Sequence, residues 1–313
     1  MAFKRTPQTF NCSMNEVTFG TGEKAVTIGG ENVYPLYTFD GEIKNKVAIG
    51  VEITDNGFDA SVPGIAEFYA GCEGMAAIAK RASEMPGASF VVLTLEGADP
   101  NGQNKSIEEC AAIAKEVADA IDCPLAVQGC KNIEKDTELF SKVAELCAGK
   151  NILIVSARQE DYKTVAASAV MAYGQKMSAE SAVDINLAKQ LNVLISQMGI
   201  AAENCVQNVG SAAAGYGFEY VASTLDRVVG AALTQNDGML QMPIVTPVGG
   251  ESWVVKESTA SEEDVPEWGS REERGIEMEV STAAACIIGG SNAVFMRHPE
   301  AVKTIANLVN ALM

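Results

Sequence analysis

The sequence contains a single histidine, His298, among 313 residues. This scarcity excludes mechanisms that need two imidazoles, and it excludes a mononuclear zinc site built from several histidine or cysteine ligands. No Gly-x-Ser-x-Gly segment stands near a predicted strand end, so a serine hydrolase is not expected either. The chain offers only one candidate for a histidine base.

Cysteine is present without a pattern that would bind a cluster. The eight cysteines include no Cys-x-x-Cys pair, and most lie in apolar helix or strand segments. Such residues are typical of free buried thiols in a reducing cytoplasm and argue against a disulfide framework. The predicted location is therefore cytoplasmic, and no iron–sulfur cluster is expected within this chain.

Basic residues and aromatic residues are both few. Against 41 acidic residues there are 23 basic ones, and the net charge of −18 argues against nucleic-acid or anionic membrane partners, which require a basic surface. No apolar run approaches the length of a membrane span, and Met1–Gln8 lacks the apolar region of a secretory signal, so a soluble protein is expected. With 47% hydrophobic but only 6% aromatic residues, the core must consist of Ala, Val, Ile and Leu, which suits helices packed on a parallel sheet.

Nucleotide-binding motifs are also missing. No Gly-x-Gly-x-x-Gly turn follows the first predicted strand and no Gly-Lys-Ser/Thr phosphate loop occurs, which weakens the alternative of a doubly wound open sheet. Instead, apolar strands alternate with amphipathic helices in eight units, which predicts an α/β fold closed into a (β/α)8 TIM barrel. The predicted strands are Val47–Thr54, Phe90–Glu96, Pro124–Gln128, Asn151–Ser156, Gln175–Ser181, Cys205–Val209, Met242–Thr246 and Asn292–Arg297.

An N-terminal β-hairpin is expected before the barrel. In residues 15–34, Val17 and Phe19 alternate with polar neighbours, a glycine-rich turn follows, and Val26 with Ile28 alternates back. We therefore divide the chain into residues 1–46, a hairpin and connector that close the barrel bottom, and residues 47–313, the (β/α)8 barrel.

Polar residues end the predicted strands, where α/β barrels place their chemistry. They are Glu52, Glu96, Gln128, Ser156, Glu180, Asn208, Thr246, and Arg297 with His298. Their amides, hydroxyls and carboxylates include no metal-binding triad. For each residue the alternative is a rim side chain bonded to a neighbouring loop.

The segment after the seventh strand, residues 249–274, is long and acidic and contains both tryptophans, Trp253 and Trp268. Such a segment above a barrel mouth suits a lid or a partner contact, because tryptophan is enriched at interface hot spots. The alternative is that both rings pack against their own barrel.

Three segments carry a resemblance to a known family. The runs Asp184–Asn192, Gly215–Tyr220 and Met296–Glu300 occur in this order, with long alignable stretches between them. They resemble the small subunit of the corrinoid/iron-sulfur protein, which is related to the delta subunit of the archaeal acetyl-CoA decarbonylase/synthase complex. The resemblance extends from about Tyr34 to the C-terminus.

This resemblance implies a barrel related to pterin-binding methyltransferases, paired in a heterodimer with a larger subunit. The larger subunit carries the [4Fe-4S] cluster and a cobamide-binding domain, so the cobamide lies at the interface. The pair carries a methyl group from methyltetrahydrofolate, through its methyltransferase, to acetyl-CoA synthase in the anaerobic acetyl-CoA pathway, which fixes carbon dioxide. The chain is then a carrier subunit in which no catalytic or metal-ligating residue is expected.

With this resemblance, the residues expected at the cobamide are Gln128, Ser156, Asn208, Ser211, Thr246, Arg297 and His298. The small residues Ser211–Ala214 would allow a large planar macrocycle to approach closely. The Asp-x-His-x-x-Gly pattern, which supplies a cobalt-ligating histidine in other corrinoid proteins, is absent. For His298, which precedes Pro299, a helix-start or rim role is favoured over cobalt ligation.

The alternative function is a stand-alone pterin- or folate-dependent methyltransferase of the same barrel family. Pterin recognition commonly uses carboxylates and amides on strand ends, but the third and fourth strands end in Gln128 and Ser156 rather than in Asp. Glu52, Glu96 and Glu180 keep this alternative open.

Overall fold

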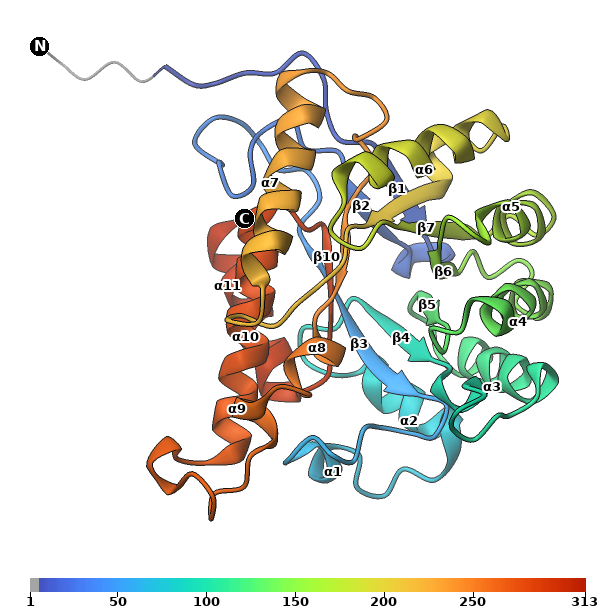
Figure 1. Ribbon diagram of the computed structural model, residues 1–313, viewed down its shortest axis with the longest axis vertical. Coiled ribbons are helices and arrows are strands. Elements are labelled where there is room, and N and C mark those ends of the chain that lie inside the picture. Colours follow the sequence, from blue (N-terminus) through green and yellow to red (C-terminus); the bar gives the residue numbers. More distant parts are fainter. Residues whose placement is uncertain (1–5) are drawn as a thin grey trace, which may run out of the picture.

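Eight parallel strands form a ring surrounded by helices in the computed structural model, which describes residues 6–313 (Figure 1). The strands follow the order β8-β7-β6-β5-β4-β3-β10-β9. The ring is completed by one parallel bridge between Gln207 and Ile244, supported by a 2.8 Å hydrogen bond from Gln207 N–H to the Pro243 carbonyl. The predicted (β/α)8 barrel is confirmed.

Each predicted strand has a counterpart in the barrel. They are β3 (Ala48–Thr54), β4 (Phe90–Thr94), β5 (Leu125–Gln128), β6 (Leu153–Ala157), β7 (Lys176–Glu180), β8 (Cys205–Asn208), β9 (Val245–Pro247) and β10 (Ala293–Met296). The seventh strand begins later than predicted, at Val245 rather than Met242. Pro243 has no N–H to give to a ladder, and the Gln207 side chain bonds the Met242 carbonyl at 2.6 Å instead.

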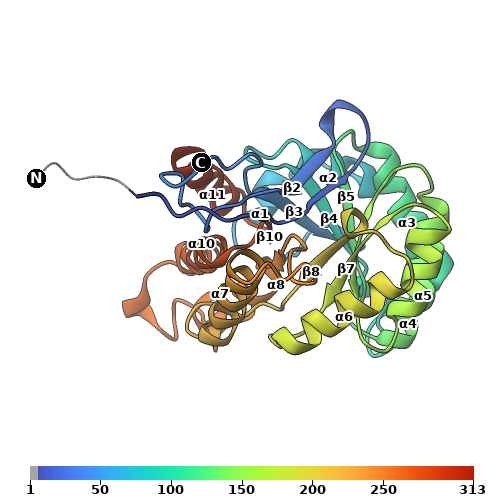
Figure 2. The same cartoon turned by 90° about the horizontal axis from the view of Figure 1, so that it is seen from above.

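The helices lie outside the ring (Figures 1 and 2). They are α1 (Ile65–Phe68), α2 (Gly74–Ser83), α3 (Ile107–Ala120), α4 (Ile133–Leu146), α5 (Tyr162–Val165) with its π-helical continuation η3 (Ala166–Met171), α6 (Ile185–Gln197), α7 (Phe218–Thr234), α8 (Gly249–Ser252), α9 (Lys256–Thr259), α10 (Arg271–Gly289) and α11 (Pro299–Leu312). Short 3-10 turns are η1 (Gly22–Lys24), η2 (Glu96–Ala98), η4 (Ala202–Asn204) and η5 (Pro266–Trp268). None of the helices in residues 6–313 has the length and apolar character that crossing a membrane requires.

Three helix boundaries follow from the local sequence. A break separates α1 from α2, where Gly71 and Gly74 adopt positive φ values of 80° and 79°. Helix α10 begins at Arg271, after the N-cap residue Ser270. Helix α3 begins with a capping box: Ser106 accepts from Glu109 N–H, and the Glu109 carboxylate accepts from Ser106 N–H.

The predicted N-terminal hairpin is present as β1 (Glu16–Phe19) and β2 (Val26–Gly29), paired antiparallel. Its side chains Val17, Phe19 and Ile28 are fully buried and join the inner core, where Phe19 meets the Phe90 ring edge-on at 5.1 Å. Figure 2 views the molecule from this end, opposite to the end toward which the strands point. The boundary between residues 46 and 47 stays a prediction.

The barrel has two hydrophobic cores separated by the sheet. Inward side chains such as Ala48, Val92 and Phe295 fill the barrel together with the hairpin. Outward side chains such as Val51 and Val294 pack against the helices. This alternation follows from the two-residue period of a strand, and it identifies which strand-end residues face the inside.

Candidate functional site

Polar side chains replace hydrophobic ones at the carboxyl ends of the strands. Glu52, Thr94, Gln128 and Asn208 each follow an inward-facing residue by two positions, so they also face inward. With their hydrogen-bonded neighbours they form a layer that closes the hydrophobic interior, which we call the polar layer. It consists of Glu52, Thr94, Gln128, Ser156, Ser178, Glu180, Asn208 and Arg297.

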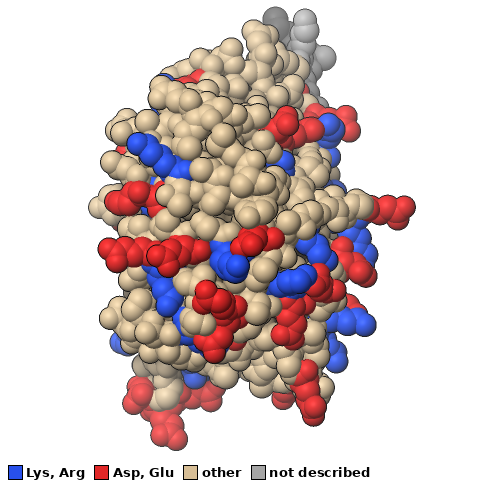
Figure 3. Space-filling model, turned by 90° about the vertical axis from the view of Figure 1, so that its right-hand side faces the viewer, with Lys and Arg blue, Asp and Glu red and all other residues tan. Residues whose placement is uncertain are grey.

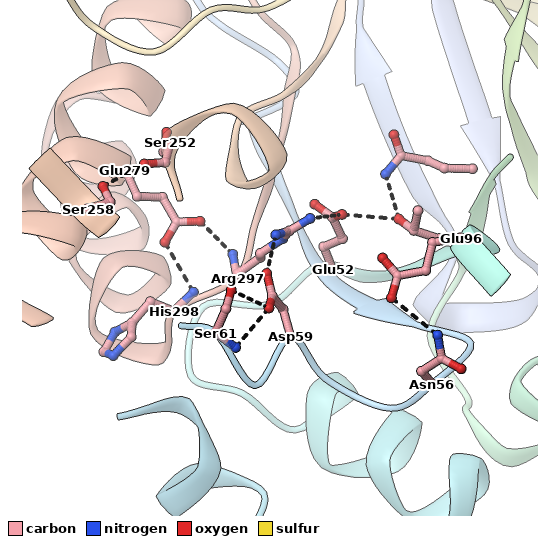
Figure 4. Close-up of polar contacts among 12 residues, drawn as sticks. Glu52, Asn56, Asp59, Ser61, Glu96, Ser252, Ser258, Glu279, Arg297 and His298 are labelled. Atoms are coloured by element: carbon pink, nitrogen blue, oxygen red, sulfur yellow. Dashed lines mark hydrogen bonds and ion pairs between the residues drawn. The ribbon is translucent and has the colours of Figure 1, made fainter. Parts of the chain in front are cut away.

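One half of the polar layer is a continuous chain of hydrogen bonds. Gln128 Nε2 donates to Thr94 Oγ1 at 3.0 Å, and Thr94 Oγ1 donates to Glu52 Oε1 at 3.1 Å. Arg297 Nη2 lies 2.7 Å from the same Glu52 oxygen, and its Nη1 lies 2.6 Å from Asp59 Oδ2 (Figure 4). Strands β5, β4, β3 and β10 are thereby linked through polar side chains near their carboxyl ends.

A buried carboxylate on α10 holds the backbone next to Arg297. Glu279 is fully buried, and its two oxygens accept the backbone N–H groups of Arg297 at 2.6 Å and of His298 at 3.1 Å (Figure 4). Burial raises the pKa of Glu279 to about 7, and the two backbone donors oppose that rise. Glu279 therefore fixes the direction in which the end of β10 presents the Arg297 side chain.

The electrostatics around Arg297 are dominated by acid. Burial opposes the charge on its guanidinium, but Glu52, Asp59 and Glu279 together raise the Arg297 pKa above the usual arginine range. Both terminal nitrogens are used by carboxylates, and the side chain is only 12% exposed. Arg297 is therefore a structural cation within an acidic group.

The other half of the polar layer is a smaller cluster of neutral groups. Asn208 Nδ2 donates to Ser156 Oγ at 3.1 Å, and the Asn208 Oδ1 accepts Gly210 N–H at 3.0 Å. Ser156 Oγ lies 3.4 Å from Ser178 Oγ. This side of the mouth offers amides and hydroxyls, whereas the side around Glu52 offers carboxylates.

The structure brings five of the predicted site residues to the mouth and leaves two elsewhere. Gln128, Ser156, Asn208 and Arg297 are members of the polar layer, and Ser211 follows β8 in the next loop. Thr246 pairs in register with Val294, which faces outward, so Thr246 also faces outward. Its side chain is fully buried, and its hydroxyl lies 2.6 Å from the Ser291 hydroxyl. Thr246 therefore does not face the mouth.

His298 is a helix-capping residue. It is 3% exposed, and its Nδ1 accepts the N–H of Glu300 in the first turn of α11. Its Nε2 lies 3.5 Å from Glu272, and burial lowers its pKa. Both nitrogens face protein groups, so the side chain has the helix-start role and does not point into the mouth.

The two tryptophans of segment 249–274 differ in environment. Trp253 is 3% exposed and packs beside His298, with ring centroids 5.8 Å apart, and against Gly275 of α10. Trp268 is 38% exposed, and its ring is flanked by the cations of Lys256 and Arg274. Trp253 thus packs on its own barrel, while Trp268 remains at the surface.

No group of three or more His, Cys, Asp or Glu side chains suited to holding a metal ion occurs within residues 6–313. The thiol pKa of the buried cysteines, for example Cys205, is raised to about 12 by burial, so these are inert thiols rather than ligands. The arrangement can bind polar groups and hold them in place. The carboxylate of Glu279 and the imidazole of His298 are both buried and are held by protein groups.

Two grooves on the outer surface are separate from this site. A groove of about 550 Å³ lies beside α4 and the α5–η3 helix, where the hydroxyls of Ser141 and Ser168 are 2.8 Å apart. Another of about 430 Å³ lies between α6 and α7. Neither is lined by a strand-end residue, and we therefore centre the candidate site on the polar layer.

The outer charge at this end of the molecule is also acidic. Figure 3 shows acidic side chains gathered at the lower end of the face it views, the end toward which β3 and β4 point in Figure 1. Segment 249–274 adds the exposed acidic residues Glu262, Glu263 and Asp264. The guanidinium groups of Arg271 and Arg274 donate hydrogen bonds to backbone carbonyls. A free anion is disfavoured at such a mouth.

Comparison with known proteins gives the chain a family and a fold. Residues 16–290 match the family described as CO dehydrogenase/acetyl-CoA synthase delta subunit. The acetyl-CoA decarbonylase/synthase complex subunit delta of Archaeoglobus fulgidus is 31% identical over 300 residues, which cover 94% of this chain and 65% of that subunit. The Methanopyrus kandleri subunit delta is 30% identical over 289 residues, which cover 91% of this chain and 70% of that subunit. The chain thus spans about two thirds of the length of these relatives.

Solved structures with the same fold are dihydropteroate synthases. The Xanthomonas albilineans enzyme with 4-aminobenzoic acid has a TM-score of 0.54 at 13% identity, covering 95% of this chain and 98% of that one. The Yersinia pestis enzyme with a sulfonamide drug has a TM-score of 0.55 at 13% identity, covering 85% of this chain and 93% of that one. At this identity the likeness concerns the barrel fold alone.

Proposed function

Because the chain belongs to the CO dehydrogenase/acetyl-CoA synthase delta subunit family, we propose that it is the small subunit of a corrinoid/iron–sulfur methyl carrier. With a large subunit it binds a cobamide at their interface. When bound, the cobamide would supply a cobalt able to carry a methyl group from methyltetrahydrofolate, through a methyltransferase, to acetyl-CoA synthase. The setting is the cytoplasm and the anaerobic acetyl-CoA pathway.

The observation that carries this proposal is the composition of the polar layer. A cobamide presents amides around a flat macrocycle, so a protein that covers it needs acceptors and donors around an open mouth rather than ligands or bases. The polar layer supplies them in Gln128, Ser156 and Asn208, and it leaves one buried acceptor, Glu52 Oε2, without a hydrogen-bond partner. The residues present therefore fit the periphery of such a cofactor.

Five of the expected residues keep a place in this proposal. Gln128, Ser156, Asn208 and Ser211 would contact the cofactor, and Arg297 would hold the neighbouring carboxylates in position. Ser211 Oγ, in the loop after β8, is buried and has no hydrogen-bond partner within residues 6–313, which suits a hydroxyl that bonds a ligand. Thr246 and His298 are left out, because Ser291 and Glu300 already engage their side chains.

The chain's own part in methyl transfer is binding and orientation. Its side chains bond the rim of the macrocycle and shield one of its faces from water, while the ligand to cobalt and the [4Fe-4S] cluster belong to the large subunit. No residue of this chain moves a proton in the proposed scheme.

A stand-alone pterin-dependent methyltransferase is not favoured. The relatives are named as subunits of a complex. Strand β5 ends in Gln128, and β6 ends in Ser156 and Ala157, so neither strand ends in a carboxylate. The likeness to dihydropteroate synthases does not revive this alternative, because it extends only to the fold.

The experiment compares the chain alone with the chain bound to its large subunit. The isolated chain should be colourless and should not bind methyltetrahydrofolate tightly in calorimetry. The purified pair should retain a cobamide absorption band after gel filtration. Micromolar folate binding to the chain alone, or a pair that never retains cobamide, would overturn the proposed function.

A further inference from the structure

We infer that Glu52 accepts a hydrogen bond from a primary amide at the edge of the bound corrinoid, an inference that rests on the proposed function. Glu52 is 4% exposed and lies near the carboxyl end of β3, with its side chain facing the inside of the barrel. Its two oxygens differ. Oε1 receives Arg297 Nη2 at 2.7 Å and Thr94 Oγ1 at 3.1 Å, whereas Oε2 is buried and has no hydrogen-bond partner among the described residues.

The unpaired oxygen is held in a fixed direction. Thr94 of β4 and Arg297 at the end of β10 fasten Oε1 from the two strands that flank β3, so rotation of the carboxylate would break both contacts. A buried acceptor that has lost water and gained no donor destabilises the fold. Such a cost at the mouth of a barrel is recovered when a ligand supplies the donor.

Charge decides what kind of donor the ligand can supply. Glu52 and Asp59 both touch the single guanidinium of Arg297, and Glu279 approaches the same residue through its backbone. A phosphate or carboxylate placed here would meet an excess of negative charge, and Arg297 has no free terminal nitrogen to bind it. The site therefore selects a neutral N–H donor.

The side-chain amides of the ring meet this requirement and lie away from the phosphate, whereas the ribose hydroxyls, which are also neutral donors, stand next to it. The phosphate of its nucleotide tail is an anion and would be repelled from Glu52. The same charge pattern also sets an orientation: the tail lies away from the β3–β10 side of the mouth, and one amide-bearing edge of the ring lies over it.

The test uses chemically altered cofactors with the intact complex. Hydroxocobalamin and its monocarboxylic derivatives, each with one peripheral amide replaced by an acid, are added to the cofactor-free pair, and binding is followed by the corrin absorption band. With the wild-type chain, one derivative should bind at least roughly tenfold more weakly than hydroxocobalamin, because its carboxylate faces Glu52.

A variant then assigns that discrimination to one residue. Glu52→Gln keeps the shape but replaces the open acceptor by a donor, so it should weaken hydroxocobalamin binding roughly 10- to 100-fold and abolish the penalty for that one derivative. Glu160→Gln, an exposed carboxylate at the same end of the barrel, should leave the whole pattern unchanged. Circular dichroism and thermal unfolding check that Glu52→Gln is folded.

The outcomes distinguish the role of Glu52 from the proposed function. If the wild-type pair binds hydroxocobalamin and all its derivatives equally, or if Glu52→Gln keeps the penalty, the role of Glu52 is overturned and the proposed function stands. If the wild-type pair binds none of them, the proposed function fails and the role of Glu52 fails with it. The wild-type pattern of derivative binding remains decisive even where Glu52→Gln does not fold.

Discussion

Arg297 and Glu52, which lie 245 residues apart in the chain, are joined by a 2.7 Å ion pair that ties the last barrel strand to the first. The pair is almost enclosed, with side-chain exposures of 12% and 3%. Because β3 and β10 are neighbours in the ring, the contact fastens their carboxyl ends where no further backbone pairing follows. The same contact fixes the orientation of the second Glu52 oxygen, Oε2.

Replacing Arg297 should destabilise the barrel strongly. Arg297→Met leaves buried Glu52 and partly exposed Asp59 without the cation that both contact, so the free energy of unfolding should fall by roughly 3–5 kcal/mol in urea titrations. Arg158→Met is the matched control. Its ion pair with Glu180 is half-buried and longer, at 3.3 Å, and its loss should cost about 1 kcal/mol or less.

A double variant checks the cause of that loss. Adding Glu52→Gln to Arg297→Met removes one of the stranded charges, so the double variant should be more stable than the sum of the single effects predicts. Strict additivity would mean that the two side chains do not interact, contrary to the structure.

The stability contributed by Glu279 should depend on pH. Burial raises its folded-state pKa from 4.5 to about 7, so the protonated form is favoured by the fold. The contribution is complete below pH 4.5 and is lost as the pH rises through about 7, an effect on the order of 3 kcal/mol at most.

The measurement compares wild type with Glu279→Gln from pH 5 to pH 8. The difference in unfolding free energy, wild type minus variant, should decrease as the pH rises, because only the wild type loses this contribution. Glu277→Gln, an exposed neighbour on the same helix, should show a flat difference. A flat difference for Glu279→Gln would show that the carboxylate has an ordinary pKa.

The sequence contained enough information for the barrel and for six of the eight residues of the polar layer, all except Thr94 and Ser178. Strand periodicity and the order of elements identified Gln128, Asn208 and Arg297 as strand-end residues, because these features are local. The partners that give those residues their roles are not local. Glu279 lies in the middle of α10, where nothing in the helical pattern separates a carboxylate facing solvent from one turned toward the end of β10.

Thr246 is a second case in which the role of a residue depends on contacts that are distant in the sequence. It was predicted to end its strand, but it is the middle residue of β9, and the direction of its side chain depends on the register of that strand. That register is the pairing with β10, and before β9 begins the Gln207 side chain bonds the carbonyls of Leu240 and Met242 in place of ladder contacts. A contact between segments more than 30 residues apart leaves no trace in local periodicity.

Replacing Val183 should increase the stability of the protein. This β-branched residue has a φ of +59°, is 40% exposed, and follows Ala182, which also has a positive φ. Val183→Asn suits that backbone region better and should raise the free energy of unfolding by about 1 kcal/mol.

The control for this change is Val254→Asn. Val254 is 65% exposed and has no positive φ, so the same change should alter stability by less than about 0.5 kcal/mol. A loss of stability in Val183→Asn would mean that packing of the valine against Gly210 outweighs the backbone strain.

Gly275 should be essential for seating Trp253. A Cβ built at Gly275 would lie 2.0 Å from Cζ3 of the Trp253 ring, so Gly275→Ala must push the indole off α10. Overpacking of this kind costs about 1–3 kcal/mol. Gly230→Ala is the matched control, because this helical glycine has no heavy atom within 4 Å of its added Cβ and should gain about 0.5–1 kcal/mol from helix propensity.

Fluorescence locates the damage. In a Trp268→Phe background Trp253 is the only indole, and its emission should be that of a buried ring until Gly275→Ala shifts it to the red. Trp253 packs beside His298, which caps α11 next to the Glu279-bound end of β10. If the red shift appears while the variant stays folded, the α8–α9 segment can separate from the barrel independently. If stability falls without a shift, the added methyl group is absorbed by α10, and Trp253 stays in place.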